Sequence, residues 1–193
     1  MTTLSGLVAM RLNHELAGPI GAISTGVDML GGDDAEIREL IADSAAALVA
    51  TLRLHRFVLA PPEIEDAAQT GRSLLQAWVR TREGLTLDWD VTPGSLTSDQ
   101  AAVLLGLAMC AAEAVPRGGA IRVGKDEIDV AAKHIMLDAD IAASLRGAPV
   151  AKPRAAIAGL VRAAADALGI DIKVSQEPTR LRIHVYHGSV LPL

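Results

Sequence analysis

The sequence predicts an α+β fold, in which a helical hairpin is followed by helices packed on a sheet. Two features carry this prediction. Up to the Pro61-Pro62 pair, apolar residues recur at spacings of three and four, as on one face of a helix. After that pair, short segments of alternating apolar and polar residues interleave with helical segments. The chain has 193 residues and is 50% hydrophobic, so it can bury a core.

Residues 3–59 form the predicted hairpin. Its turn is expected at residues 31–34, where Gly31 suits a helix C-cap and Asp33 or Asp34 suits the next N-cap. Each helix carries one apolar stripe, made of Leu12, Leu16, Ile20, Ile23, Val27 and Leu30 in the first and of Ile37, Ile41, Leu48, Leu52 and Leu59 in the second. A lone hairpin leaves an open flank on both stripes. We therefore predict a homodimer in which two hairpins form a four-helix bundle.

Residues 61–193 form the second predicted unit, so the expected domains are 1–60 and 61–193. Helices are expected at 64–81, 98–115 and 157–168. Strands are expected at 85–91, 120–124, 129–136, 170–175 and 181–186. Together these elements predict a C-terminal α/β sandwich.

Composition narrows the function classes. The formal charge is −5 and the basic residues are dispersed, which argues against nucleic acid as a partner. A single cysteine, Cys110, cannot form an internal disulfide or a thiolate metal cluster and fits a reducing compartment. The longest apolar stretch, 101–112, is shorter than the roughly 20 residues that span a bilayer. The N-terminus lacks the basic region of a signal peptide, so we expect a cytoplasmic protein that binds no membrane.

The most informative residue is His14. With Leu16 at the centre of the first stripe, His14 lies about 160° away, on the solvent face. Near the same outward line fall Arg11, Gly18, Gly21 and Thr25, a track on which a partner protein could approach the backbone. Pro19 cannot donate the hydrogen bond that the Glu15 carbonyl would have accepted, so we expect a bend after the histidine.

A neutral imidazole is a competent nucleophile near pH 7. The adjacent Glu15 could orient the ring or stabilise positive charge during attack. This pair therefore predicts a site that accepts a phosphoryl group and passes it on. The alternative, from position alone, is an ordinary surface histidine.

Several motifs resemble a known family. The segment from His14 to Pro19, His-Glu-Leu-x-x-Pro, is similar to the H-box of histidine-kinase dimerisation and phosphotransfer domains. Residues 14–23 are closer still to ChpT-type histidine phosphotransferases, and residues 52–57 and 113–119 also resemble that group. The resemblance implies a homodimer with a central four-helix bundle, a C-terminal domain shaped like a degenerate kinase ATPase domain, and His14 as phosphoacceptor.

The sequence argues against nucleotide and metal sites. Gly106 and Cys110 stand where related kinases carry asparagines that hold Mg²⁺, and neither offers a hard oxygen ligand. The Asp-x-Gly-x-Gly loop of those kinases is absent. For metals, position 18 is glycine where a zinc motif on His14 and Glu15 would need histidine. His184 and His187 should face opposite sides of a strand. We expect Asp138 and Asp140 to be solvated acids and Cys110 a buried apolar residue.

We therefore expect a phosphorelay protein that moves a phosphoryl group between receiver-domain aspartates through His14. The receivers would belong to a hybrid histidine kinase and to response regulators, and they would supply their own Mg²⁺, so this chain needs no cofactor. Arg11 would contact phosphate or an acidic rim of the receiver. Two other functions stay open: an ATP-dependent histidine kinase with an atypical nucleotide site, and a dimeric adaptor that binds receivers without carrying phosphate.

Overall fold

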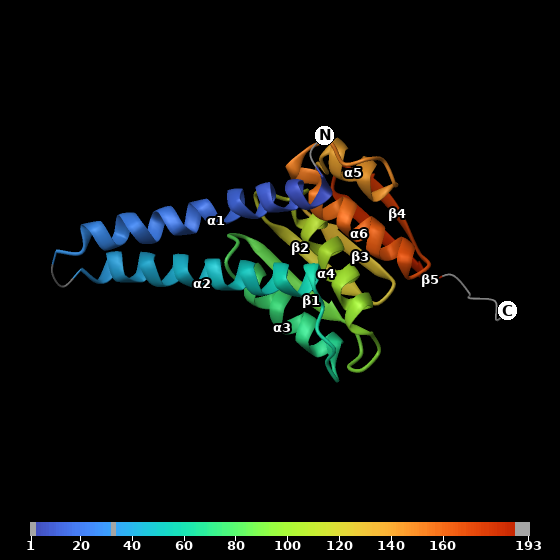
Figure 1. Cartoon of the computed structure of the whole chain (residues 1–193), viewed down its shortest axis with the longest axis horizontal. Helices are drawn as coiled ribbons and strands as arrows, with labels where there is room; N and C mark the ends of the chain where they lie inside the picture. Colours follow the sequence, from blue (N-terminus) through green and yellow to red (C-terminus); the bar gives the residue numbers. More distant parts are fainter. Residues whose placement is uncertain (1–2, 32–33, 188–193) are drawn as a thin grey trace.

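A computed structural model describes residues 3–31 and 34–187. It confirms an α+β fold, in which the hairpin helices extend beyond one end of an α/β layer (Figure 1). The helices are α1 (Leu4–Met29), α2 (Ala35–Leu59), α3 (Ala67–Val79), α4 (Ser98–Ala112), α5 (Ala139–Leu145), the 3₁₀ turn η1 (Pro153–Ala155) and α6 (Ala156–Ala167). The strands are β1 (Leu85–Asp90), β2 (Gly119–Gly124), β3 (Glu127–Ala131), β4 (Ile170–Glu177) and β5 (Arg180–His187).

The strands form one mixed sheet in the order β1-β2-β3-β5-β4. β1 and β2 are parallel and joined through α4, while the other pairs are antiparallel. One sheet face is apolar and lies under the helices, with Ile121, Ile128 and Ile183 fully buried. Alternate residues such as Arg122 and Asp129 form ion pairs on the opposite face.

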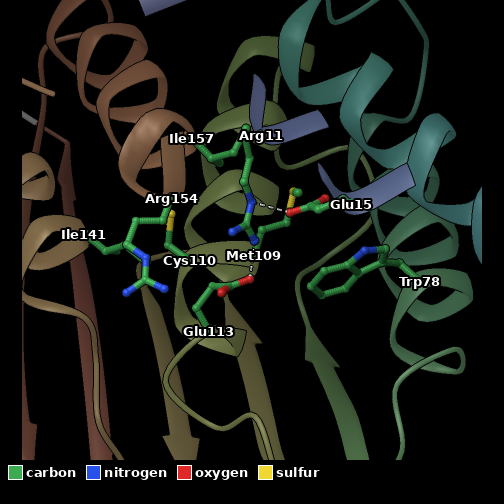
Figure 2. Close-up of a pocket in the computed structure, with 9 residues that line it drawn as sticks. All are labelled: Arg11, Glu15, Trp78, Met109, Cys110, Glu113, Ile141, Arg154 and Ile157. Carbon is green, nitrogen blue, oxygen red and sulfur yellow. Dashed lines mark hydrogen bonds and ion pairs between the residues drawn. The ribbon is translucent and has the colours of Figure 1, made fainter. Parts of the chain in front are cut away.

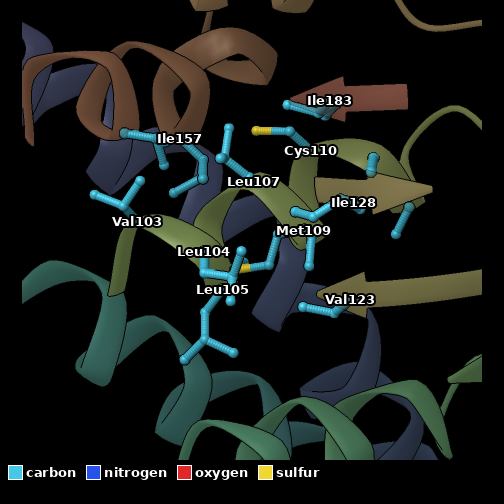
Figure 3. Close-up of a cluster of buried hydrophobic side chains, with 14 of the residues drawn as sticks. Val103, Leu104, Leu105, Leu107, Met109, Cys110, Val123, Ile128, Ile157 and Ile183 are labelled. Atoms are coloured by element: carbon cyan, nitrogen blue, oxygen red, sulfur yellow. The ribbon is translucent and has the colours of Figure 1, made fainter. Parts of the chain in front are cut away.

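Helix α4 lies at the centre of the core. Every residue from Ala101 to Ala112 is buried, because α4 contacts the sheet on one side and α2, α3 and α6 on the others. Figure 3 shows Leu105 and Leu107 on different sides of this helix. A helix that is apolar all round is expected where neighbours cover it completely.

The hairpin is rooted in this core at one end. The C-terminal half of α2 contributes Leu54, Phe57 and Val58 to the main apolar cluster, and the start of α1 packs on α6 through Leu7 and Val8. Farther along the hairpin, apolar side chains are exposed, including Ile20 and Val27. The dimeric bundle that would cover them stays a prediction, as does the division of the chain at residue 60.

The predicted elements are confirmed with local corrections. Asp34 caps α2 by accepting a hydrogen bond from the Ile37 amide, whereas Asp33 lies outside the described residues. The C-cap of α1 is Leu30, not Gly31. The strand expected at 129–136 is wrong beyond Ala131, where pairing with β5 ends. None of the described helices has the length and apolarity needed to cross a bilayer.

Candidate functional site

His14 lies on the solvent-exposed side of α1, as predicted. Within residues 3–31 and 34–187, its imidazole has no hydrogen bond or ion pair, so both ring nitrogens are open to a visiting molecule. Gly18, Gly21 and Thr25 are exposed along the same helix. A Cβ placed on Gly18 or Gly21 would meet no atom within 4 Å. We call these three residues and His14 the α1 track.

Arg11 does not belong to this exposed surface, so the expectation that it faces outward is wrong. Its side chain is only 15% exposed. The guanidinium Nε donates to Glu15 Oε1 at 2.5 Å, and Nη2 donates to Glu113 Oε1 at 2.6 Å. Figure 2 shows Arg11 between the two carboxylates, above the end of α4. Its partners place Arg11 at the junction of the hairpin and the α/β layer.

Glu15 also turns away from His14. Its second oxygen, Oε2, accepts a hydrogen bond from His55 Nε2 at 2.6 Å. An ionised carboxylate can only accept, so this imidazole nitrogen carries the proton. His55 lies in α2 and is 1% exposed, while its Nδ1 has no partner among the described residues. Glu15 therefore joins α1 to α2, and Arg11 continues the connection to α4.

The electrostatic environment keeps Glu15 and Arg11 charged. Burial alone would raise the pKa of Glu15, but the hydrogen bond from His55 and the charge of Arg11 outweigh it, so the pKa is lowered. Burial lowers the pKa of Arg11, but the charges of Glu113 and Glu15 raise it by more. Arg82 stacks 3.8 Å above the Trp78 ring nearby, and burial lowers its pKa.

The arrangement at His14 suits nucleophilic attack without a base from this chain. A neutral imidazole already holds a lone pair on one ring nitrogen, so no proton has to be removed before that nitrogen attacks. Both oxygens of Glu15 are used by Arg11 and His55. The predicted role of Glu15 as a group that orients the His14 ring is not seen in these contacts.

Sequence reasoning missed His55 and Glu113 as members of the site region. A signal existed, because His55 and Glu113 stand in residues 52–57 and 113–119, two of the segments that resemble histidine phosphotransferases. Their contacts with Glu15 and Arg11 could not be predicted from it, since these contacts join positions 40 and 102 residues apart along the chain.

The residues considered for other chemistry have separate places. Gly106 and Cys110 are buried in α4, and burial raises the pKa of the Cys110 thiol to about 12. Asp138 caps α5 and pairs with Arg154, and Asp140 pairs with Lys152, so the two acids do not share a strand. On β5, His184 and His187 lie near different acids, Glu127 and Asp126. Among the described residues, no three acidic, histidine or cysteine side chains gather as a metal ligand set.

A groove of about 970 Å³ opens at the end of α4. Arg117, Lys133 and His134 line it together with the Gly118-Gly119 turn. Glu113, the partner of Arg11, also lines this groove.

A solved structure shares this fold. A bacterial phosphotransferase superposes with a TM-score of 0.81 at 22% identity, covering 95% of both chains. A histidine kinase domain of the Erythrobacter litoralis blue-light activated kinase EL346 has a TM-score of 0.47 at 10% identity, covering 91% of this chain and 94% of that one. Acinetobacter baumannii histidine kinase AdeS also gives 0.47, at 12% identity and with 89% and 95% covered. The search of curated proteins found no match.

A family of known proteins matches residues 68–180, more than half of the chain. The matched range runs from α3 to the start of β5 and so includes α4 and Glu113. The family is described as the histidine phosphotransferase C-terminal domain. The chain belongs to this histidine phosphotransferase family.

Proposed function

We propose that this chain is a cytoplasmic phosphorelay protein that carries a phosphoryl group on His14 between the aspartates of two receiver domains. The observation that carries the proposal is the exposed imidazole of His14 on the α1 track, which has no partner among the residues that the structure describes. Membership of a histidine phosphotransferase family supports phosphoryl transfer in general. The relay role, the receivers and the acceptor residue are the proposal.

The chemistry balances without help from another group of this chain. A ring nitrogen of neutral His14 attacks the phosphorus of a receiver's acyl phosphate. The N–P bond forms, the P–O bond to the aspartate breaks, and the carboxylate leaves. In the second step, the carboxylate of another receiver attacks phosphorus and the imidazole leaves. Phosphoryl transfer depends mainly on positioning and charge stabilisation, which the receiver and its Mg²⁺ would supply.

The α1 track supports docking of a receiver beside His14. Without side chains at Gly18 and Gly21, a helix or loop of the receiver can approach the α1 backbone closely. The proposal leaves Arg11 out of this surface, because both arms of its guanidinium bind carboxylates of this chain. Docking must be weak enough for release, since a relay protein exchanges partners.

The exposed hairpin supports the predicted homodimer. Apolar side chains at least 43% exposed recur along the hairpin away from the core, namely Ile20 and Val27 of α1, its C-cap Leu30, and Leu40, Val49 and Leu52 of α2. A second hairpin packed against them would form the four-helix bundle. Light scattering should give the mass of two chains at micromolar concentration. A strict monomer would contradict the bundle.

The proposal also separates this chain from ATP-dependent kinases. Gly106 packs against Val58 and Val161, and Cys110 is buried, so neither position offers oxygen to Mg²⁺. Incubation with radiolabelled ATP and Mg²⁺ should therefore leave the chain unlabelled. Label on His14 from ATP would establish the kinase alternative instead.

The relay is tested with a receiver domain phosphorylated by radiolabelled acetyl phosphate, chosen as the receiver that labels the wild-type chain most. Label should appear as an acid-labile, base-stable adduct and be lost in His14→Ala. His134→Ala is the matched control, because His134 is also exposed and should keep full labelling. Equal labelling of His14→Ala would refute the assignment. Receiver binding without any label would favour the adaptor.

Docking on the α1 track has its own test. Gly21→Leu adds a side chain where a receiver would approach, and its Cβ would meet no other part of the described chain within 4 Å. Transfer from the receiver should fall about tenfold, which corresponds to about 1.4 kcal/mol of docking free energy. Ala163→Leu adds a similar side chain to an exposed position of α6 and should leave transfer unchanged. Equal rates in the two variants would place the receiver elsewhere.

A further inference from the structure

A charged cluster joins three helices next to His14. It consists of Arg11 and Glu15 of α1, His55 of α2 and Glu113 at the C-cap of α4. Three contacts of 2.5–2.6 Å connect these four side chains in the order His55, Glu15, Arg11, Glu113. Exposure ranges from 1% for His55 to 31% for Glu113. Since Glu15 follows His14 directly, the cluster holds the turn of α1 that presents the phosphoacceptor.

Stability alone is a weak reason for charges in this place. Removing charged groups from water costs free energy, and well-packed apolar residues often serve as well. A guanidinium adds direction, because its donors point along fixed axes in one plane. Apolar contacts would let α1 rotate or slide, whereas Arg11 holds Glu15 and Glu113 at defined angles.

Pro19 weakens the helix at this turn, so side-chain contacts that fix the turn are useful there. It lies inside α1 and has no N–H, so the backbone carbonyl of Glu15 lacks its usual helical hydrogen bond. The backbone following His14 is thus less constrained than in an ordinary helix. The side chain of the same residue, Glu15, is tied to α2 and, through Arg11, to α4.

We propose that Arg11, Glu15, His55 and Glu113 form an orientation lock that fixes the rotation of α1 and so aims the His14 imidazole at the phosphorus of a docked receiver. These four are positioning residues, which touch neither the phosphoryl group nor the receiver. The inference rests on the proposed function of His14. It assigns Glu15 a role different from that of a base.

The lock is tested with Arg11→Lys, which keeps the charge but loses the planar fork. The matched control is Arg162→Lys. Arg162 is also 15% exposed and pairs with an acid four residues later, Asp166, but lies in α6 away from His14. Glu113→Gln is the second variant, because its half-exposed side chain can change with less effect on folding. Circular dichroism checks that each chain is folded.

Two phosphoryl donors, a receiver and a small molecule, distinguish the orientation of the His14 ring from its intrinsic reactivity. The rate of transfer from the phosphorylated receiver to the chain is measured in single turnovers at increasing receiver concentration. In Arg11→Lys the maximal rate, kcat, should fall about 10- to 100-fold, while the half-saturating concentration, KM, changes little. This result is expected when the reacting atoms are misplaced. Labelling by phosphoramidate, a small donor that diffuses to His14 freely, should stay within about twofold of wild type. Arg162→Lys should match wild type with both donors.

The results distinguish the two proposals. Wild-type kcat in folded Arg11→Lys, or in Glu113→Gln if Arg11→Lys does not fold, overturns the lock. An equal loss in Arg162→Lys also overturns it, because the effect is then general. Loss of receiver transfer with intact phosphoramidate labelling supports it. Failure of the proposed function looks different, since label would then be absent from wild type or remain in His14→Ala.

Discussion

Replacing Gly106 with alanine measures how tightly α4 is enclosed. Gly106 lies in the middle of α4, in the core between α2 and α6. A Cβ at this position would fall on Cγ2 of Val161 and lie 3.3 Å from Cγ1 of Val58. Val161 is β-branched and lies in a helix, so its side chain has little freedom to turn aside. The added methyl group therefore forces neighbouring atoms to move.

Two opposing terms decide the magnitude. Alanine is favoured over glycine inside a helix by about 1 kcal/mol. Overpacking a well-filled core costs about 1–3 kcal/mol. Gly21→Ala in α1 is the matched control, because it has the same helical gain with no atom near its Cβ. The difference in unfolding free energy between the two variants isolates the packing cost, so Gly106→Ala should be the less stable by about 1–3 kcal/mol.

Urea unfolding followed by far-UV circular dichroism gives both free energies. Gly21→Ala should unfold at higher urea than wild type, and Gly106→Ala at lower urea than Gly21→Ala, with similar slopes. Equal midpoints for the two variants would show that the core around Gly106 accepts a methyl group without cost. The contact between Gly106 and Val161 would then be looser in solution than described above.

Three further predictions concern single side chains. Because the pKa of Glu15 is lowered in the folded chain, its ionised form stabilises the fold above about pH 4.5, and this stabilisation is lost as pH falls through the folded-state pKa. The difference in unfolding free energy between wild type and Glu15→Gln, measured with urea, should therefore shrink from about pH 7 to about pH 3. An unchanged difference would contradict this. Burial raises the pKa of Cys110 to about 12, so a thiol reagent at pH 8 should label it only after unfolding, and rapid native labelling would show access to the core. Asp34→Ala removes the N-cap of α2 and should cost about 1 kcal/mol in thermal or urea unfolding, whereas no loss would mean that the cap is not used in solution.

The hairpin was predictable from the sequence, but which side of each helix faces its neighbour was not. Two contacts identify the facing sides, since Glu15 meets His55 and Gly26 lies against Ile41. The helical rows through these residues are Val8, Arg11, Glu15, Pro19, Ala22 and Gly26 in α1, and Ile41, Ser44, Leu48, Thr51, His55 and Val58 in α2. Polar and small residues occupy half of these positions or more. Counting apolar residues therefore favoured a neighbouring side, on which Ile20 and Val27 are in fact exposed.

The candidate site could be predicted where it depends on local helix position and not where it depends on distant contacts. His14 and the glycines were found because exposure follows from the position on the helix. The inward direction of Arg11 depends on Glu113, which only the tertiary fold brings near. Likewise, α5 was missed because it has only seven residues and its N-cap, Asp138, follows soon after β3 ends at Ala131. Local periodicity carries no record of such distant contacts.

The burial of the C-terminal half of α2 limits how far the hairpin can move. Swinging the hairpin away from the α/β layer would bring Leu54, Phe57 and Val58 into water, at a cost of about 1.5–3 kcal/mol for each side chain. Thermal motion would therefore seldom separate the described parts of the hairpin from the α/β layer. In the proposed relay, a donor and an acceptor would each have to travel to His14, because His14 would not swing out to meet them.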